Sequence, residues 1–133
     1  MVDGLKMPDG TTPVVLIVED DPALWRLYEE KFKKEGFEAI IARDGETGLN
    51  LALTKHPDFI LLDMLLPKMK GIDVLERLMT EPNSKDIAVI VLTNVTEREE
   101  ADKALKLGAK EYLAKAMHSP EDIVMRAKKH LGL

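Results

Sequence analysis

The chain has 133 residues, a formal net charge of −5 and no cysteine, and this length suits one domain with its own hydrophobic core. The absence of cysteine excludes disulfides and a thiol nucleophile, and the negative charge argues against nucleic acid as a direct partner. No apolar run reaches the roughly 20 residues of a membrane span, so we expect a cytoplasmic protein with no membrane partner.

A lead-in precedes an alternating pattern of short and long segments. Residues 1–13 are rich in glycine, proline and charge, and we expect them to be flexible, whereas residues 14–133 are expected to form the domain. Within the domain, short apolar runs predict strands and the longer periodic segments predict helices. The strands are expected at Val14–Val18, Glu38–Ala42, Phe59–Leu62, Ala88–Leu92 and Glu111–Ala114.

Each strand is followed by a segment in which apolar residues recur three and four positions apart, as on the buried face of a helix. The expected buried stripes are Leu24, Leu27, Tyr28 and Phe32; Leu49, Ala52 and Leu53; Leu75, Leu78 and Met79; Ala101, Ala104 and Leu105; and Ile123, Val124, Ala127 and Leu131. The expected N-terminal caps are Asp21, Asp44, Thr96 and Ser119, and Gly36 and Gly108 follow two of the helices.

This alternation predicts an α/β fold of the (βα)5 type, a doubly wound parallel sheet with helices on both faces. The first, third and fourth strands are apolar at nearly every position, which is typical of strands covered on both sides. In open parallel sheets, ligands bind beyond the carboxyl ends of the strands. The residues that follow the predicted strands are therefore the candidates for a functional site.

Polar side chains of complementary types stand at the ends of four predicted strands. Glu19 and Asp20 follow the first strand, Asp63 follows the third, Thr93 the fourth and Lys115 the fifth. Adjacent carboxylates repel one another unless a cation joins them, and Mg²⁺ suits carboxylates that must also leave room for phosphate oxygens. A metal-bound carboxylate can act as a nucleophile toward phosphorus, while a hydroxyl and an ammonium can contact the phosphoryl oxygens.

Each of these residues alone has an ordinary structural explanation. An aspartate after a strand often ends it, an acidic cluster favours a helix N-terminus, and a single lysine is usually solvated. Independent structural causes do not predict that acids, a hydroxyl and a lysine all gather at one edge of one sheet. The combination therefore indicates a site of phosphoryl chemistry.

Four segments, in this order and at this spacing, resemble the receiver domain of bacterial two-component response regulators, including the chemotaxis regulators. The resemblance extends from about Val14 to Leu131 and implies a flavodoxin-like sheet with strand order 2-1-3-4-5. The segments are VLIVEDDP (15–22), LLDMLLPKMKG (61–71), VLTN (91–94) and KLGAKEYLAK (106–115).

The resemblance implies a phosphoacceptor and a metal site. Asp63 would accept a phosphoryl group from a sensor histidine kinase, a phosphotransfer protein or a small phosphodonor. Glu19, Asp20, Asp63 and the backbone carbonyl of Leu65 would hold Mg²⁺, with Glu19 acting through water. The domain would be a signalling switch and not an enzyme, beyond catalysing its own phosphorylation and dephosphorylation.

The resemblance also implies how the switch is transmitted. Thr93 and Lys115 would contact the phosphoryl oxygens, and Thr93 would form a switch pair with Tyr112. The fourth helix, fifth strand and fifth helix would then present a changed surface to a downstream protein. The domain would act as a monomer or as a phosphorylation-dependent homodimer, alone or as part of a longer regulator.

Several positions depart from the family pattern, among them Lys70, which stands where a small or acidic residue is common. Ala116 stands where the family usually has proline, so we expect either a trans bond after Lys115 or a strained loop. Asn94 is larger than usual, and the apolar Leu65 lies two residues after the acceptor, so the lifetime of the phosphoryl group is open.

Two alternative functions are a phosphate-independent pseudo-receiver that only binds a partner and a Mg²⁺-dependent aspartyl-phosphate phosphatase. The phosphatase usually has a second aspartate where Leu65 stands.

Overall fold

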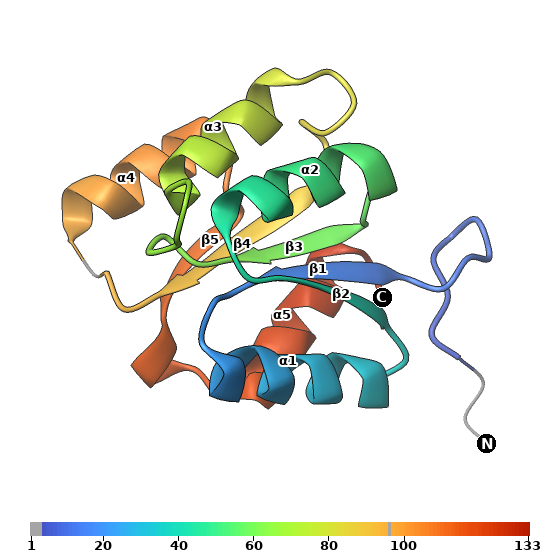
Figure 1. Ribbon diagram of the computed structural model, residues 1–133. Coiled ribbons are helices and arrows are strands. Elements are labelled where there is room, and N and C mark those ends of the chain that lie inside the picture. Colours follow the sequence, from blue (N-terminus) through green and yellow to red (C-terminus); the bar gives the residue numbers. More distant parts are fainter. Residues whose placement is uncertain (1–3, 96) are drawn as a thin grey trace.

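The computed structural model describes residues 4–95 and 97–133, and a parallel five-stranded sheet lies at its centre with helices on both faces (Figure 1). The strand order is β2-β1-β3-β4-β5, which is the flavodoxin-like order that the resemblance implies. The strands are β1 Val14–Val18, β2 Glu38–Ala42, β3 Phe59–Leu62, β4 Ala88–Thr93 and β5 Glu111–Ala114. The helices are α1 Pro22–Lys34, α2 Gly45–Lys55, α3 Gly71–Thr80, α4 Arg98–Leu107, the short 3₁₀ helix η1 Lys115–Met117 and α5 Pro120–His130. The predicted strand bounds are confirmed, except that β4 extends one residue further, through Thr93.

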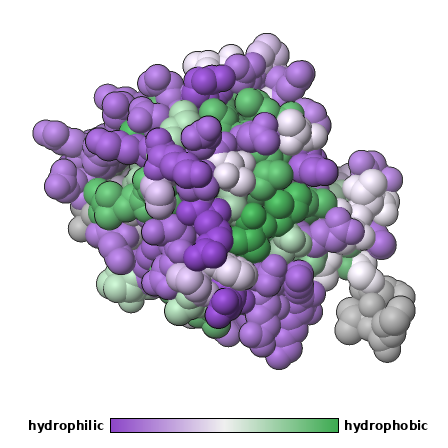
Figure 2. All heavy atoms as spheres, in the orientation of Figure 1, coloured by the Kyte–Doolittle hydropathy of each residue, from purple (hydrophilic) through white to green (hydrophobic). Residues whose placement is uncertain are grey.

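Two hydrophobic clusters hold the layers together, one on each face of the sheet. Alternate residues of β1 point to opposite sides, so Leu16 packs toward α2, α3 and α4 while Ile17 packs toward α1 and α5 (Figure 1). Both side chains are fully buried, and each such side chain contributes about 1.5–3 kcal/mol relative to exposure. Hydrophilic side chains cover most of the face seen in Figure 2, and a hydrophobic patch remains between α2 and α1, where the edge strand β2 runs.

Two residues assigned to buried stripes are in fact exposed. Leu27 and Leu105 are each 45% exposed, so this part of the prediction is wrong. On α1 the buried residues are Tyr28 and Phe32, four positions apart, and Leu27 lies at the flank of that stripe. On α4 only Ala104 is buried. The helices thus bury narrower stripes than their apolar residues suggest.

The predicted caps lie at the helix ends. The side chains of Asp21, Asp44 and Ser119 each accept a backbone N–H in the first turn of α1, α2 and α5. Thr96 lies outside the described residues, and Glu97, which precedes α4, makes no side-chain cap hydrogen bond. Glycines in the left-handed region follow α1 and α4 as predicted, at Gly36 (φ +98°) and Gly108 (φ +124°).

The strand register brings the carboxyl ends of three strands to one level. Val18 of β1 is paired with Ala42 of β2 and with Leu62 of β3. The next residues, Glu19 and Asp63, continue this pairing, because Glu19 N donates to Ala42 O at 3.0 Å and Asp63 N donates to Val18 O at 3.1 Å. The sheet therefore places two acids side by side at its edge.

Among the described residues, no helix is long and apolar enough to cross a membrane.

Candidate functional site

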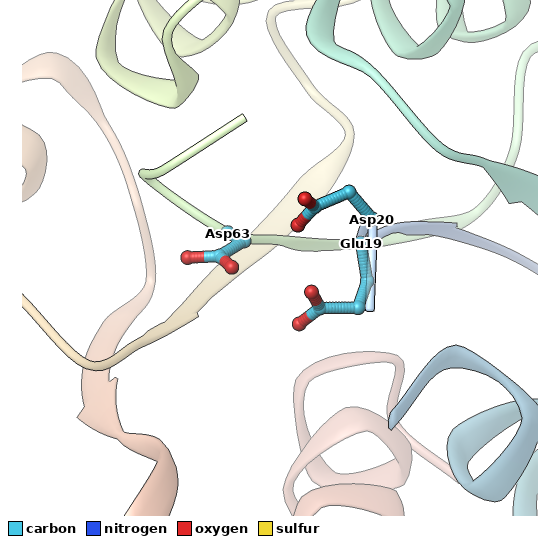
Figure 3. A group of neighbouring side chains, drawn as sticks. All are labelled: Glu19, Asp20 and Asp63. Atoms are coloured by element: carbon cyan, nitrogen blue, oxygen red, sulfur yellow. The ribbon is translucent and has the colours of Figure 1, made fainter. Parts of the chain in front are cut away.

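Three carboxylates converge at the carboxyl edge of the sheet. Glu19 and Asp20 follow β1, and Asp63 follows β3 on the neighbouring strand. One carboxylate oxygen from each lies within 4.8 Å of the others, and Figure 3 shows the three side chains pointing into a common space. Glu19 and Asp63 are only 4% and 5% exposed, whereas Asp20 is exposed. The predicted acidic cluster is therefore formed, with Asp20 on its open side.

Lys115 supplies the positive charge of this cluster. Its Nζ lies 2.6 Å from Glu19 Oε1 and 2.7 Å from Asp63 Oδ2, so one ammonium bridges the two buried carboxylates. Burial alone would lower the pKa of Lys115, but the hydrogen bonds to Asp63 and Glu19 outweigh burial and raise it. Burial raises the pKa of Glu19, and the nearby charge of Asp63 adds to this, while the Lys115 hydrogen bond opposes it. Lys115 is therefore a charged ammonium at neutral pH.

Backbone amides hold the second oxygen of each buried carboxylate. Asp21 N donates to Glu19 Oε2 at 3.1 Å, and Leu65 N donates to Asp63 Oδ1 at 3.3 Å. These bonds fix the orientation of both carboxylates before any ligand binds. The side chain of Leu65 is 63% exposed, and its backbone carbonyl as a metal ligand stays a prediction.

The loop after Asp63 is held by two glycines, and Gly45 was not among the predicted site residues. A Cβ at Gly71 would lie 2.1 Å from Asp63 O, and a Cβ at Gly45 would lie 1.9 Å from Met69 O. Gly45 N also donates to Pro67 O at 3.1 Å. The start of α2 therefore supports the loop that follows Asp63. No local pattern marks this role, because it depends on a contact between distant segments.

Thr93 and Tyr112 are joined through Val95 and not directly. Thr93 is fully buried at the end of β4, and its Oγ1 accepts a hydrogen bond from Val95 N at 3.2 Å. Tyr112 Oη, from β5, donates to Val95 O at 2.6 Å. Within the described part of the chain, the two side chains share no hydrogen bond. The roles of Thr93 and Tyr112 as a switch pair stay predictions, and Val95 is an intermediate that the sequence did not indicate.

The structure shows whether the peptide bond after Lys115 is cis or trans. Every peptide bond in residues 4–95 and 97–133 is trans, the Lys115–Ala116 bond included. The chain turns through η1 immediately afterwards. Of the two expectations for this position, the trans bond is the one observed.

The donor set suits a hard divalent cation. Three carboxylates offer oxygen ligands only, and one of them, on Asp20, faces the open side of the cluster. Mg²⁺ prefers one or two carboxylates together with water, which this arrangement allows. The residues present therefore fit the predicted metal.

A family model for the response regulator receiver domain matches residues 15–128. The chain belongs to this family. Receiver domains are the signalling switches of two-component systems, and they bind Mg²⁺ at an acidic pocket. The match therefore favours a switch over the phosphatase considered above.

Two curated relatives of this receiver domain are named as transcriptional regulators. It is 36% identical over 103 residues to the DNA-binding dual master transcriptional regulator RpaA of Synechocystis sp., covering 77% of this chain and 43% of that protein. It is 32% identical over 124 residues to the probable transcriptional regulatory protein TcrX of Mycobacterium tuberculosis, covering 93% of this chain and 52% of that protein. The chain thus spans about half the length of these relatives.

Solved structures agree with the family. A CheY-like response regulator receiver domain protein from Methanospirillum hungatei matches with a TM-score of 0.86 at 27% identity, covering 92% of this chain and 95% of that one. The Mn²⁺-bound form of response regulator Rcp1 matches with a TM-score of 0.76 at 31% identity, covering 88% and 90%. These likenesses support the receiver fold and its strand order.

Proposed function

We propose that this receiver domain is a phosphoacceptor switch in which Asp63 takes a phosphoryl group from a histidine kinase or a phosphotransfer protein in the cytoplasm. The observation that carries the proposal is the bridge from Lys115 to Glu19 and Asp63, beside the exposed Asp20. Asp63 is buried, and the ammonium of Lys115 lies 2.7 Å from its carboxylate. The same ammonium can pair with the anionic phosphoryl group after its transfer to Asp63.

Glu19, Asp20, Asp63 and the carbonyl of Leu65 would hold Mg²⁺, which supplies charge neutralisation at the acceptor and the phosphoryl group. The likeness to the Mn²⁺-bound form of Rcp1 supports binding of a divalent ion by this domain. An oxygen of Asp63 forms the new bond to phosphorus while the bond from phosphorus to the donor nitrogen breaks, and the electron pair leaves with the imidazole. Lys115 moves from the two carboxylates to a phosphoryl oxygen.

The hydrogen bonds of Val95 suggest how the switch is transmitted. If the hydroxyl of Thr93 turns to a phosphoryl oxygen, Val95 N loses its present acceptor. The segment at Val95 then shifts, and Tyr112 loses the carbonyl that its hydroxyl holds. The phosphoryl group favours this second arrangement because it makes contacts in that state alone.

The route of this shift indicates the output surface. Val95 precedes α4, and Tyr112 lies on β5, so both moving groups border the surface formed by α4, β5 and α5. We infer that a downstream protein, or an output domain of a longer regulator, recognises this surface. The two named relatives are transcriptional regulators, and a role of this chain in regulating transcription is a proposal.

Phosphorylation by a small donor tests the function directly. Acetyl phosphate with Mg²⁺ should add the mass of one phosphoryl group to the intact chain, and peptide mapping should place it on Asp63. Asp63→Asn should abolish the addition, whereas Asp86→Asn, a change at an exposed loop acid, should leave it intact. Undiminished phosphorylation of Asp63→Asn would falsify the acceptor assignment. A wild-type chain that takes no phosphoryl group would favour the pseudo-receiver.

A further inference from the structure

Two arginines gather on one tryptophan beside the acidic site. Trp25 lies in the first turns of α1 and is half-buried. The guanidinium carbon of Arg26 lies 5.2 Å from the centroid of its ring, and that of Arg43 lies 5.9 Å from it. Both distances are within the range of cation–π attraction. One aromatic ring from α1 therefore holds two cations, one from its own helix and one from the end of β2.

The strand register places this group at the edge of the sheet where the acids lie. Val18 is paired with Ala42, so the residues that follow them, Glu19 and Arg43, are neighbours on adjacent strands. Adjacent strands lie about 4.8 Å apart, and Glu19 N still bonds to Ala42 O at 3.0 Å. The two cations therefore flank the acidic site on its β2 side.

These two guanidinium groups are available to an anion from solvent. Arg26 and Arg43 are both exposed, and among the described residues neither has a carboxylate within 4.0 Å. Glu19, the neighbour of Arg43 across the sheet, is paired with Lys115, and the guanidinium of Arg43 lies over the Trp25 ring instead. The other arginines of the chain each have a carboxylate partner within that distance: Arg77, Arg98 and Arg126.

We propose that Arg26 and Arg43 form a recruitment site for small anionic phosphodonors, of the acyl phosphate class, at the rim of the pocket that contains Asp63. The proposal rests on the proposed function and assigns the two residues that capture a small donor for the same site. The three carboxylates outnumber the single charge of Lys115 and repel a dianionic donor until a metal is bound. With or without the metal, two nearby guanidinium groups attract the donor and raise its local concentration. Arg is also the side chain best suited to bind phosphate oxygens in a bidentate manner.

The chemical step stays at Asp63. The carboxylate of Asp63 attacks phosphorus, the bond between phosphorus and the acyl oxygen breaks, and the electron pair leaves with the released carboxylate. No oxidant or further reactant is needed. Arg26 and Arg43 bind and orient the donor and take no part in the bonds that change, so their loss should affect capture and not the acceptor chemistry.

The test compares two doubly substituted full-length chains. Arg26→Gln/Arg43→Gln removes the recruitment site, and Lys33→Gln/Lys34→Gln removes the same charge from two exposed lysines at the far end of α1. Phosphorylation rates are measured by intact mass with acetyl phosphate at low donor concentration and saturating Mg²⁺. Phosphoramidate, which carries less negative charge at neutral pH, is the second donor.

With acetyl phosphate at low ionic strength, the arginine double variant should react about threefold to tenfold more slowly than wild type. This is the size expected for two positive charges that lie on the order of 10 Å from a dianionic donor. The loss should be smaller with phosphoramidate and should vanish near 1 M salt, where the Debye length is about 3 Å. The lysine double variant should match wild type.

Equal acetyl phosphate rates for the arginine variant and wild type at low salt would overturn the proposal. So would a loss of the same size at low and high salt, or a loss of the same size in the lysine variant. If wild type accepts no phosphoryl group from either donor, the proposed function fails together with this inference. Wild-type phosphorylation that is insensitive to the arginines refutes the recruitment site alone.

Discussion

Replacing Lys115 with methionine should destabilise the folded chain in a way that Mg²⁺ repairs. The side chain of Lys115 is 10% exposed, and the two carboxylates that it bridges are 5% and 6% exposed. At the observed 2.6 and 2.7 Å, each attraction amounts to about 6 kcal/mol at an effective dielectric constant of about 20, before desolvation is subtracted. Removing one partner of a buried ion pair typically costs about 3–5 kcal/mol, because the other charge stays buried.

We expect Lys115→Met to lower the free energy of unfolding by about 3 kcal/mol in EDTA at neutral pH. Mg²⁺ at 100 times its dissociation constant should restore about 2.7 kcal/mol to the variant, since it binds only the folded chain. The stabilisation of wild type should be smaller, because Lys115 competes with the metal for Glu19 and Asp63. Acidification should narrow the gap, since protonating one carboxylate removes the repulsion.

Urea denaturation in EDTA and in Mg²⁺, followed by far-ultraviolet circular dichroism, measures these differences. Lys85→Met, a change at an exposed loop lysine, is the matched control and should lose less than about 0.5 kcal/mol. The account of the bridge is refuted if Lys115→Met loses no more than this control. It is also refuted if Mg²⁺ stabilises the variant no more than wild type.

Three further predictions concern the surroundings of the site. Gly45→Ala should cost about 1–3 kcal/mol in urea denaturation and weaken Mg²⁺ binding, because its Cβ would lie 1.9 Å from Met69 O. Tyr112→Phe should cost about 0.5–1.5 kcal/mol, because it removes the donor to Val95 O, and the amide resonances around Val95 should shift. Hydrogen bonds from the Arg126 guanidinium and the His118 imidazole lower the pKa of Asp122 below its ordinary value of 3.8. The resulting stabilisation is complete above that value and is lost as pH falls through the lower folded pKa, so Asp122→Asn should flatten the stability curve below about pH 4.

Each of these predictions has an outcome that contradicts it. Gly4→Ala, whose Cβ meets only the end of a lysine at 3.8 Å, is the control for Gly45→Ala, and equal losses would reject the close contact. Unchanged amide resonances around Val95 in Tyr112→Phe would reject the link between β4 and β5. An acid transition of Asp122→Asn identical to that of wild type would reject the ionic role of Asp122.

Much of the fold could be predicted because strands and helices differ in their apolar period. Strand bounds are within one residue, since β1, β3 and β4 are continuous apolar runs between polar residues. The burial of Leu27 and Leu105 was predicted wrongly, because an apolar residue at the flank of a helix is packed only if a neighbour reaches it. Which neighbours reach it depends on the path of distant segments.

The candidate site was predictable for a different reason, which is that parallel strands end at one edge. Glu19, Asp63 and Lys115 each follow a strand, so the topology alone brings them together. The backbone groups that contact the site side chains and the loop after Asp63 were not predictable. The roles of Val95 and Gly45 depend on an amide, a carbonyl and a missing Cβ, none of which shows in local residue patterns.

The link between Thr93 and Tyr112 passes through the backbone of a single residue, Val95. Val95 offers its N–H to one partner and its C=O to the other, so the identity of its side chain is irrelevant to the connection. The side chain of Val95 packs against the core cluster on the α2, α3 and α4 side, so packing limits the residue type at this position and the two hydrogen bonds do not. Proline lacks the N–H that Val95 donates to Thr93, so under the proposed function we expect Val95→Pro to uncouple phosphorylation from output while the acidic pocket stays intact.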